Sequence, residues 1–574
     1  MATIVHDKPY LMRLYRFDGG LDDVTSPWIL PANVMSELNN ADLSKTGLVK
    51  KAKGKSKFIS ESLGANPIKS LYICTIDSTK YYICSYTTTL KYSSNGTSWS
   101  SLATGLTDAD WYFVNTPTWL YCFNGTENRK WDGTSFLNFG ITAPTAAPTK
   151  NSTIDGSLTE AREYYYKYTY YNSSAGIESD PSPASTALTA SADPNDGFKL
   201  NLTGSSDAQV DKIKVYRTYG NTATPFWYEG IVNNAAGTVT YNSTTADASL
   251  STTQLYEKQA KAPAAKYPVL HGGRLFLVPT ANTNQIIFSE PAPYLEYFPA
   301  YNVLYTPNLE PIVGMASSQE DLYVFTENSI NVLNTPFTES PEDAWSMVKV
   351  VSTGCSATKS IVATKNYIFY LGKSGIMAFD GTSTQCIKEL PNLNQNYIGL
   401  SCACYHNERL YFAVPEGDDT TPAQLYELIL KTGAWIKHPD IKAARVMQSS
   451  SNVLYAGDVT NGLVYKFFDG EDNDGAAFEF SLKTGYIDFG DYTKNKTGIK
   501  LFIPGLSGTG TFDIYIEGHA THEVEDVAIG GFRYYKFEQG MHGQAYKLGI
   551  SHSSKTAFEI AGLSLLYRFL GDVN

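Results

Sequence analysis

The chain has 574 residues, more than one hydrophobic core usually serves, so we expect two to four domains. Its 41 tyrosines and its many Val, Ile and Thr residues favour strands, and no long Ala/Leu/Glu/Lys tract predicts a helix. The formal net charge of −12 argues against a protein that wraps nucleic acid over its general surface, because phosphate contacts need clustered Lys and Arg. The composition therefore predicts a multi-domain, all-β protein.

Residues 1–65 lie outside the repeat described below and are expected to form an N-terminal arm or docking segment. The beginning of the chain lacks an apolar core with a cleavage site, and no window approaches about 18 uninterrupted apolar residues. We therefore expect synthesis in a cytoplasm without export through a secretion channel. A basic run in this segment indicates either a solvated loop or a docking patch for an acidic partner. Its lysines are Lys50, Lys51, Lys53, Lys55 and Lys57.

A hairpin recurs about seven times, over residues 66–143 and again over 259–480. Each copy has a strand containing Leu-Tyr or its equivalent, a turn and a second strand, as in "NYIFYLGKSGIMAFDG" from Asn366. Asn-Gly or Asp-Gly often closes the copy and favours a type I′ turn, because both central residues of that turn need a positive φ. The pairs expected at equivalent places are Asn95 with Gly96, Asp132 with Gly133, Asp380 with Gly381, and Asp469 with Gly470.

Hairpins that repeat every 40 residues or so are typical of a β-propeller, because no single copy can bury both of its faces. We predict about six to seven blades, with residues 66–143 as the first blades and 259–480 as the remaining ones. The rival architecture is a string of β-sandwiches. "HGGRLFLV" from His271 matches "HNERLYFAV" from His406, which places Arg274 and Arg409 at equivalent positions and indicates a structural role for both.

Residues 144–258 interrupt the repeat with five or six short strands separated by turn residues, the pattern of a small antiparallel sandwich. This segment resembles a fibronectin type III domain: Tyr164, Tyr166 and Tyr168 alternate on one strand, and Tyr216 is expected to point inward from "IKVYRT". Residues 481–574 alternate apolar and polar side chains around Gly-rich turns, which predicts a final β-sandwich or sheet.

No motif in the sequence supports catalysis or metal binding. The odd number of thinly spread cysteines indicates reduced thiols, and Cys402 and Cys404 are expected to be small buried residues. "HATHE" from His519 lacks the zincin order of residues, and "DGEDNDG" from Asp469 lacks the EF-hand order. No Gly-x-Ser-x-Gly, P-loop or dinucleotide fingerprint occurs. We predict a protein that is not an enzyme, without catalytic residues, cofactor or metal.

The segment "RFDGGLDDVTSPWILPANVMSELNNADLSKTGLVKKAKG", from Arg16 to Gly54, resembles the opening of virion proteins of tailed bacteriophages. "IIFSEPAPYLEYFP", "YLGKSGIMAFDGTSTQCI" and the terminal "EIAGLSLLYRFLGD" are similar to the same family. That family is the β-propeller tail nozzle proteins of short-tailed phages, also called tail tubular protein B. The resemblance covers most of the chain outside residues 144–258, and the chain departs from the larger nozzle proteins in its length and in this insertion.

The resemblance implies a structural protein of the virion tail, assembled in the host bacterial cytoplasm as a homo-oligomeric ring, expected to be a hexamer. The ring would line the DNA exit channel below portal and adaptor, retain the genome and conduct it during DNA ejection. Its partners would be the portal, the adaptor, other tail proteins and double-stranded DNA that passes without specific binding, with fibres or the host surface as further contacts. The competing hypothesis is a receptor- or glycan-binding propeller of the virion, whose exposed Tyr and Trp stack on sugars.

Overall fold

The computed structural model describes residues 8–45, 47–191, 196–318, 320–334, 345–441, 445–507, 510–517, 521–529, 532–536 and 542–572. Within these ranges the regular structure consists of strands and three short 3₁₀ helices, Asp247–Ser249, Thr358–Ser360 and Ile398–Leu400. No helix in this part of the chain is long and apolar enough to span a bilayer. The predicted all-β class, built from many small sheets, is confirmed.

The chain forms two compact units. Unit 1 comprises Met1–Ile73, Tyr81–Thr104 and Thr353–Asn574, and unit 2 comprises Cys74–Lys80 and Gly105–Ser352. Unit 1 thus gathers both ends of the chain, while unit 2 holds the segment that interrupts the repeat.

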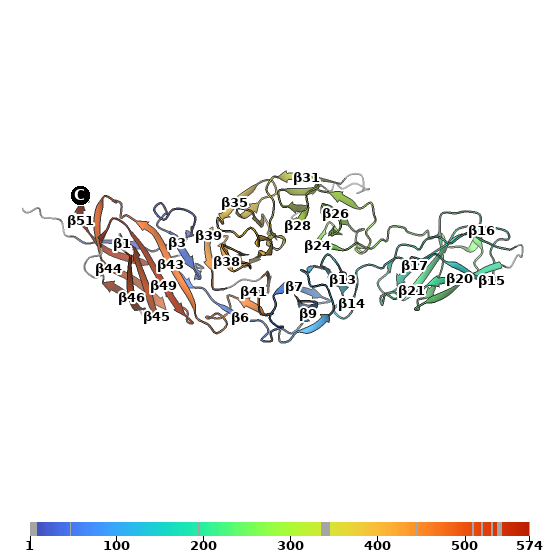
Figure 1. Ribbon diagram of the computed structural model, residues 1–574, viewed down its shortest axis with the longest axis horizontal. Coiled ribbons are helices and arrows are strands. Elements are labelled where there is room, and N and C mark those ends of the chain that lie inside the picture. Colours follow the sequence, from blue (N-terminus) through green and yellow to red (C-terminus); the bar gives the residue numbers. More distant parts are fainter. Residues whose placement is uncertain are drawn as a thin grey trace, which may run out of the picture. The chain divides into compact units, whose positions relative to one another are not determined.

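In the described part of the chain, seven antiparallel meanders of four strands account for most of the repeat (Figure 1). Meander 1 is β7 (Ile68–Ile76), β8 (Thr79–Tyr86), β9 (Thr89–Ser93) and β10 (Ser100–Ala103); meander 2 is β11 (Tyr112–Asn115), β12 (Leu120–Phe123), β13 (Asn128–Trp131) and β14 (Phe136–Asn138). Meander 3 is β24 (Ala265–His271), β25 (Arg274–Pro279), β26 (Gln285–Phe288) and β27 (Val303–Tyr305); meander 4 is β28 (Ile312–Ser318), β29 (Asp321–Thr326), β30 (Ile330–Asn334) and β31 (Ser346–Val351).

The remaining three meanders belong to unit 1. Meander 5 is β32 (Val362–Ala363), β33 (Ile368–Gly372), β34 (Gly375–Phe379) and β35 (Thr384–Glu389); meander 6 is β36 (Cys402–His406), β37 (Arg409–Val414), β38 (Gln424–Ile429) and β39 (Ala434–His438). Meander 7 is β40 (Val446–Ser450), β41 (Val453–Gly457), β42 (Val464–Phe467) and the distant β6 (Lys55–Lys57). Because β6 pairs with β42, the N-terminal segment supplies the fourth strand of the last meander.

The turns of the meanders correct the expected turn type. All four Asn-Gly or Asp-Gly pairs follow the third strand of a meander, but only the glycines have a positive φ, between 71° and 100°. Instead of forming type I′ turns, the side chains of Asn95, Asp132 and Asp380 accept a hydrogen bond from the backbone N–H two residues later, at 2.8–2.9 Å. Such an Asx turn needs positive φ only at the glycine.

Turns with two positive φ values lie elsewhere, between the first and second strands. The pairs with this geometry are Asp77 with Ser78, Gly272 with Gly273, Asn407 with Glu408, and Ser451 with Asn452. Three of the four contain no glycine but an Asp or Asn, which tolerates the left-handed conformation, and the tertiary fold imposes that conformation on the neighbouring Ser or Glu.

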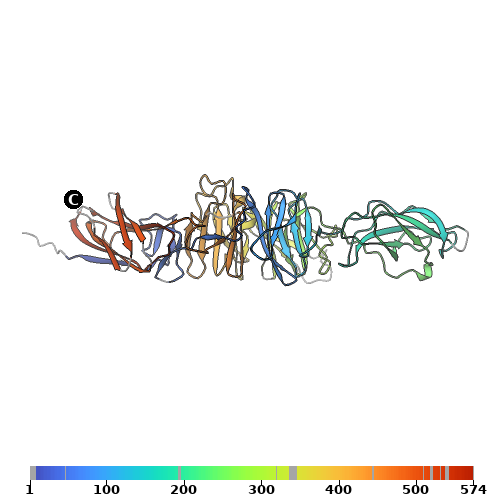
Figure 2. The same ribbon diagram turned by 90° about the horizontal axis from the view of Figure 1, so that it is seen from below.

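The segment that interrupts the repeat forms two facing sheets in unit 2 (Figure 2). One sheet is β15 (Thr149–Asp155), β20 (Asp196–Thr203) and β23 (Thr238–Ser243), and the other is β18 (Ile177–Glu178), β17 (Tyr166–Asn172), β21 (Lys212–Arg217) and β22 (Trp227–Asn233); β16 (Glu163–Tyr164) pairs with β19 (Leu188–Thr189). Tyr164, Tyr166 and Tyr168 are fully buried in the shared core. Tyr216 is also buried, but it packs on Phe226 in a separate cluster, because Val215 occupies the core-facing position of β21.

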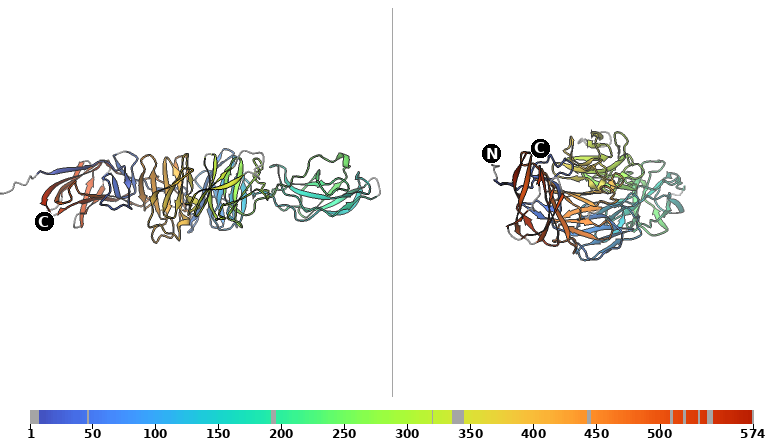
Figure 3. Two further views of the ribbon diagram at one scale, coloured as in Figure 1. Left: turned by 90° about the horizontal axis from the view of Figure 1, so that it is seen from above. Right: turned by 60° about the vertical axis from the view of Figure 1, so that its left-hand side comes forward.

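Residues at both ends of the chain form the terminal β-domain (Figure 3). One sheet contains β1 (Tyr10–Leu14), β51 (Leu563–Asp572), β44 (Lys494–Ser507), β50 (Glu559–Ile560), β5 (Val49–Lys51), β4 (Ala41–Asp42), β47 (Phe532–Lys536) and β48 (His542–Gly543). The other continues meander 6 with β2 (Gly20–Leu21), β3 (Val34–Asn39), β43 (Phe478–Ile487), β49 (Tyr546–Ser554), β45 (Gly510–Glu517) and β46 (Thr521–Ile529).

The N-terminal segment is therefore no separate arm, and the expected boundary at residue 65 does not divide it from the rest of unit 1. β1 pairs with β51, β3 pairs with β43, and β5 pairs with β50. The apolar side chains Leu14, Met35 and Val49 of these strands are buried in the same core as Leu482 and Leu565. Folding of the terminal β-domain thus depends on residues that are more than 400 positions apart in the sequence.

Candidate functional site

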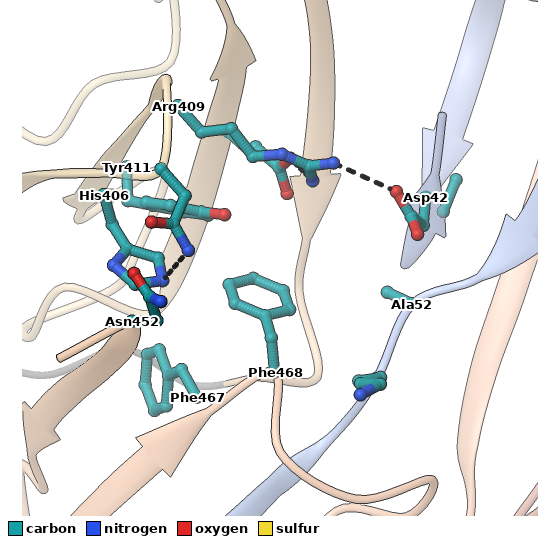
Figure 4. A pocket seen from close by; sticks show the side chains of 12 residues that line it. Asp42, Ala52, His406, Arg409, Tyr411, Asn452, Phe467 and Phe468 are labelled. Carbon is teal, nitrogen blue, oxygen red and sulfur yellow. Dashed lines mark hydrogen bonds and ion pairs between the residues drawn. The ribbon is translucent and has the colours of Figure 1, made fainter. Parts of the chain in front are cut away.

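A pocket of about 400 Å³ in unit 1 is the candidate site (Figure 4). It lies where the N-terminal segment meets meanders 6 and 7. The lining residues are Ala41, Asp42, Ala52, Lys53, His406, Asn407, Arg409, Tyr411, Glu427, Asn452, Phe467 and Phe468. Its volume falls in the range of small-molecule sites in proteins.

Arg409, the first residue of β37, links the N-terminal segment to meander 6. Its guanidinium donates to the carboxylate of Glu427, and Nη2 lies 3.2 Å from Oδ1 of Asp42 on β4 (Figure 4). Burial lowers the pKa of Arg409, but the carboxylates of Glu427 and Asp42 outweigh this effect and the pKa is raised overall. The other oxygen of Glu427 lies 2.9 Å from Nε2 of His438, and both of these side chains are buried. The charges at the base of the pocket are therefore mutually compensated.

Three aromatic side chains form an apolar wall. The ring centroid of Phe468 lies 5.2 Å from that of Tyr411 and 5.1 Å from that of His438, and Phe467 stands edge-on to Phe468. Burial raises the pKa of the Tyr411 phenol well above its ordinary value, so this side chain is neutral at physiological pH. Phe468 has a φ of 55°, a strained conformation for a bulky residue.

His406 and two asparagines supply the polar part of the pocket. Nδ1 of His406 lies 2.8 Å from Oγ of Ser449, and the amide nitrogen of Asn407 donates to Nε2 at 3.0 Å. Burial, with a further contribution from Arg409, lowers the pKa of His406, so its ring is neutral at neutral pH. Asn452, in the turn between β40 and β41, has a φ of 60° and lines the pocket from meander 7.

The acidic groups of the pocket are already paired. Glu427 is the most deeply buried acid of the pocket, but Arg409 and His438 already occupy its two oxygens. Within the described residues, no group of three or more His, Cys, Asp or Glu side chains is placed to hold a metal ion. His519 lies outside those residues, and so does the side chain of His522.

The five lysines of the basic run have different environments. Lys53 is exposed at the pocket, Lys50 lies 3.4 Å from Glu559, and Lys57 lies 3.4 Å from Asp474. Lys51 and Lys55 are buried over the rings of Phe478 and Tyr465. A docking role for this run stays a prediction, and Lys50, Lys53 and Lys57 are the members with accessible side chains.

The ammonium of Lys51 holds three segments of unit 1 together. It donates to the backbone carbonyl of Glu471 at 3.1 Å and to that of Ser554. Burial lowers the pKa of Lys51 to about 8, against the opposing effect of Glu471 and Asp472. Lys51 therefore acts within the fold and is not available to an outside partner.

The cysteines are all free thiols. Cys402 and Cys404 of β36 are buried, and burial raises the pKa of each thiol to about 12. Both pack in the core shared by meanders 6 and 7. Their expected character as small buried residues is confirmed.

Sequence reasoning found Arg409 but missed its partners and the pocket. Asp42 and Glu427 are 385 residues apart in the sequence, and no spacing rule connects them. The available signal was the repeated lead-in "HNERLYF", which places His406 and Arg409 at the start of a hairpin.

Comparisons with known proteins give no family. No family model matches the chain, and no curated protein matches it. Among solved structures, apo AztD from Citrobacter koseri is similar over 65% of this chain and 86% of its own, with 8% identity and a TM-score of 0.30. A streptogramin B lyase is similar over 72% of this chain and 97% of its own, with 9% identity and a TM-score of 0.27. Kluyveromyces lactis Hsv2p is similar over 65% of this chain and 97% of its own, with 8% identity and a TM-score of 0.24. At these scores the likenesses carry no argument about function.

Proposed function

We propose that this protein is a structural subunit of a bacteriophage tail, a nozzle protein whose copies form a ring around the DNA exit channel. In this proposal the seven meanders are the blades of one propeller, and the two-sheet segment is a fibronectin type III-like insertion between the second and third blades. The proposal starts from the resemblance of Arg16–Gly54 to the opening of tail nozzle proteins. It requires that the surface of the chain bind further copies.

Exposed apolar side chains on the terminal β-domain are the observation that carries the proposal. These residues are Tyr10, Leu11, Tyr15, Val24, Trp28, Ile29, Tyr492 and Tyr534. Trp28 is 60% exposed and Ile29 is 73% exposed, in a loop before β3. Aromatic residues are enriched in the interfaces between protein subunits. Neighbouring copies of the ring would cover these side chains.

The loop that presents Trp28 is held in place, as a contact surface requires. The Trp28 indole stacks on Tyr486 with ring centroids 4.1 Å apart and an interplanar angle of 15°. The backbone N–H of Tyr486 donates to the carbonyl of Pro27 at 2.8 Å. A side chain fixed before association loses little conformational entropy on binding, which favours an assembly contact.

The charge of the chain fits a conduit through which DNA moves. A net charge of −12 per copy makes a ring strongly acidic, and an acidic wall repels phosphate within roughly 10 Å at physiological salt. DNA would then slide past the wall without specific binding. The role would be passive, with no step of chemistry.

Negative-stain electron microscopy and sedimentation velocity of the purified full chain test the proposal. We expect closed rings, and we expect Trp28→Glu combined with Ile29→Glu to lower the assembled fraction at least ten-fold, because two charges enter an apolar contact. Tyr405→Glu, which changes an aromatic residue of β36 that is 40% exposed, is the matched control and should leave the rings intact. A wild-type chain that stays monomeric at every concentration, in the presence of the other tail proteins, would contradict the proposal.

A further inference from the structure

We propose that the pocket between the N-terminal segment and meanders 6 and 7 binds a neutral pyranose, either as a free sugar or as one unit of a glycan. This inference goes beyond the structural role proposed above and does not depend on a ring. It rests on the shape of the pocket, the chemistry of its walls and the balance of its charges.

The partly exposed ring of Phe468, backed by the buried rings of Phe467 and Tyr411, fits the apolar face of a sugar ring. Phe468 lies in the middle of the lining residues, with Phe467 on one side and Tyr411 on the other (Figure 4). The face of an aromatic ring is negative, and the C–H groups on one face of a pyranose are slightly positive, so the two surfaces attract one another. The volume of about 400 Å³ admits one or two sugar units.

The polar wall fits the hydroxyl groups at the edge of the sugar. Asn407 uses its amide nitrogen on His406, and its oxygen can accept a hydrogen bond from a ligand. The Asn452 amide makes no hydrogen bond within the described residues, and it offers both donors and acceptors. Paired donors and acceptors of this kind match a hydroxyl group, which needs both.

The charges of the pocket favour a neutral ligand. Arg409 and Lys53 are balanced by Asp42 and Glu427, and His406 is neutral. Arg409 is already bound to two carboxylates, so an anionic ligand would have to displace one of them. Lys53 is an exposed lining residue, and the Asp469 carboxylate that it influences pairs with Lys466 at 3.2 Å. A phosphate or carboxylate group would therefore compete with the carboxylates on Arg409 and would meet Lys53 as the exposed cation.

Strained backbone surrounds the pocket. Asn407, Glu408, Asn452 and Phe468 have φ values between 48° and 60°. Non-glycine residues in this conformation cost about 1–2 kcal/mol each and persist where the fold fixes them, often at ligand sites. The left-handed backbone of Phe468 places its ring against Tyr411 and His438, so the aromatic wall is formed before a ligand arrives.

Lysine labelling with an amine-reactive reagent, read by mass spectrometry, tests the site on the full chain. The probes are the methyl glycosides of glucose, galactose, mannose and N-acetylglucosamine. We expect at least one glycoside to protect Lys53 with a Kd of about 1 mM, the affinity expected of a single sugar unit. Lys57, which is exposed but outside the pocket, should not be protected. A glycan array then shows whether the sugar is also bound as a terminal unit of a longer glycan.

Asn452→Gly provides the matched variant, because glycine keeps the left-handed turn and removes only the amide. We expect protection of Lys53 to need about five-fold more glycoside, the effect of one lost hydrogen bond. Ser78→Gly makes the same change at the equivalent turn of meander 1, where φ is 69°, and should leave binding unchanged. The proposal is overturned if no glycoside protects Lys53 up to about 50 mM, well above the expected Kd. Equal binding by wild type and Asn452→Gly, or protection by phosphate or N-acetylneuraminate alone, would also overturn it.

Discussion

Meanders 3 and 6 begin with the same residues and use them differently. In both, a histidine ends the first strand and its Nδ1 meets a serine on the first strand of the next meander: His271 lies 2.9 Å from Ser317, and His406 lies 2.8 Å from Ser449. The arginines three residues later have different partners. Arg409 binds Glu427 and Asp42, whereas Arg274 donates to the carbonyl of Ser289 at 2.7 Å.

The two meanders also differ at one register position of the third strand. Tyr411 pairs with Glu427, and at the corresponding place in meander 3 Phe276 pairs with Phe288. The Arg274 guanidinium therefore lies over the Phe288 ring, 5.7 Å from its centroid. At the corresponding place in meander 6, the Arg409 guanidinium meets the Glu427 carboxylate. The repeat fixes the backbone and the histidine contact, and the third-strand residue differs: Glu427 gives Arg409 an ion pair, and Phe288 gives Arg274 a cation–π contact. The Arg409 guanidinium also reaches Asp42 of the N-terminal segment, at 3.2 Å.

The largest difference in stability between the two meanders should come from replacing each arginine. Arg409→Leu leaves the buried carboxylate of Glu427 with only His438, and we expect it to lower the free energy of unfolding by about 3–5 kcal/mol. Arg274→Leu removes the hydrogen bond to Ser289 and the cation–π contacts with Phe288 and Trp345, and we expect it to cost about 1–2 kcal/mol. Denaturant unfolding of both variants, followed by tryptophan fluorescence, measures the difference.

A double variant serves as the control for this comparison. Because an apolar pair often replaces a buried ion pair without loss, Arg409→Leu combined with Glu427→Leu should regain a large part of the lost stability. Equal losses for Arg409→Leu and Arg274→Leu would show that Glu427 does not set the two meanders apart.

Substitutions in the turns that follow the two histidines should change the free energy of unfolding in opposite directions. Glu408 has a φ of 60°, so Glu408→Gly removes left-handed strain and should stabilise unit 1 by about 0.5–1 kcal/mol. Gly273 holds the same place in meander 3 with a φ of 75°, and a Cβ there would meet no atom within 4 Å. Gly273→Ala should therefore cost about 1 kcal/mol through backbone strain alone.

Thermal unfolding of the two variants measures both effects. Glycine also gains freedom in the unfolded chain, which sets the upper limit on the stabilisation from Glu408→Gly. Destabilisation by Glu408→Gly would mean that the glutamate makes contacts in meander 6 that outweigh its strained backbone.

The turns also show how far the sequence predicts the fold. Asn-Gly and Asp-Gly marked the ends of hairpins, because glycine tolerates positive φ wherever it occurs. The turn type was wrong because the side chain of Asp132 or Asp380 caps the following N–H groups and makes a second positive φ unnecessary. The actual turns with two positive φ values include Asn407 with Glu408, and no local preference identifies the glutamate. Strand pairing on both sides imposes them.

Long-range pairing limited the prediction of the site in the same way. The basic run was visible, but β6 and β5 pair with strands more than 400 residues away, and this pairing buries Lys51 and Lys55. The alternation of Tyr164, Tyr166 and Tyr168 was enough to predict one buried face, since one strand decides it. The pocket needed three separate segments to meet, and no single stretch of sequence carries that information.

The smallest expected effect concerns the pH at which the two histidines titrate. Burial lowers the pKa of both rings; at His406 the Arg409 guanidinium lowers it further, whereas at His271 the Asp321 carboxylate opposes the shift. An unfolded histidine has a pKa of about 6.5, so the unfolded state binds more protons between that value and the folded pKa. Stability from both contacts is therefore complete above pH 6.5 and is lost as the pH falls toward the folded pKa.

Since the two rings are buried to a similar extent, the neighbouring charge should decide their order, and His406 should become protonated at lower pH than His271. NMR titration of the imidazole Cε1–H signals, assigned with His406→Gln and His271→Gln, measures both pKa values. Each variant should also reduce the loss of stability between pH 6.5 and 5, because one of the two groups that take up a proton on unfolding is gone. A lower pKa for His271 than for His406 would show that Arg409 is not the charge that distinguishes the two meanders. The Glu427 and Asp42 carboxylates would then have to neutralise the field of Arg409 at His406.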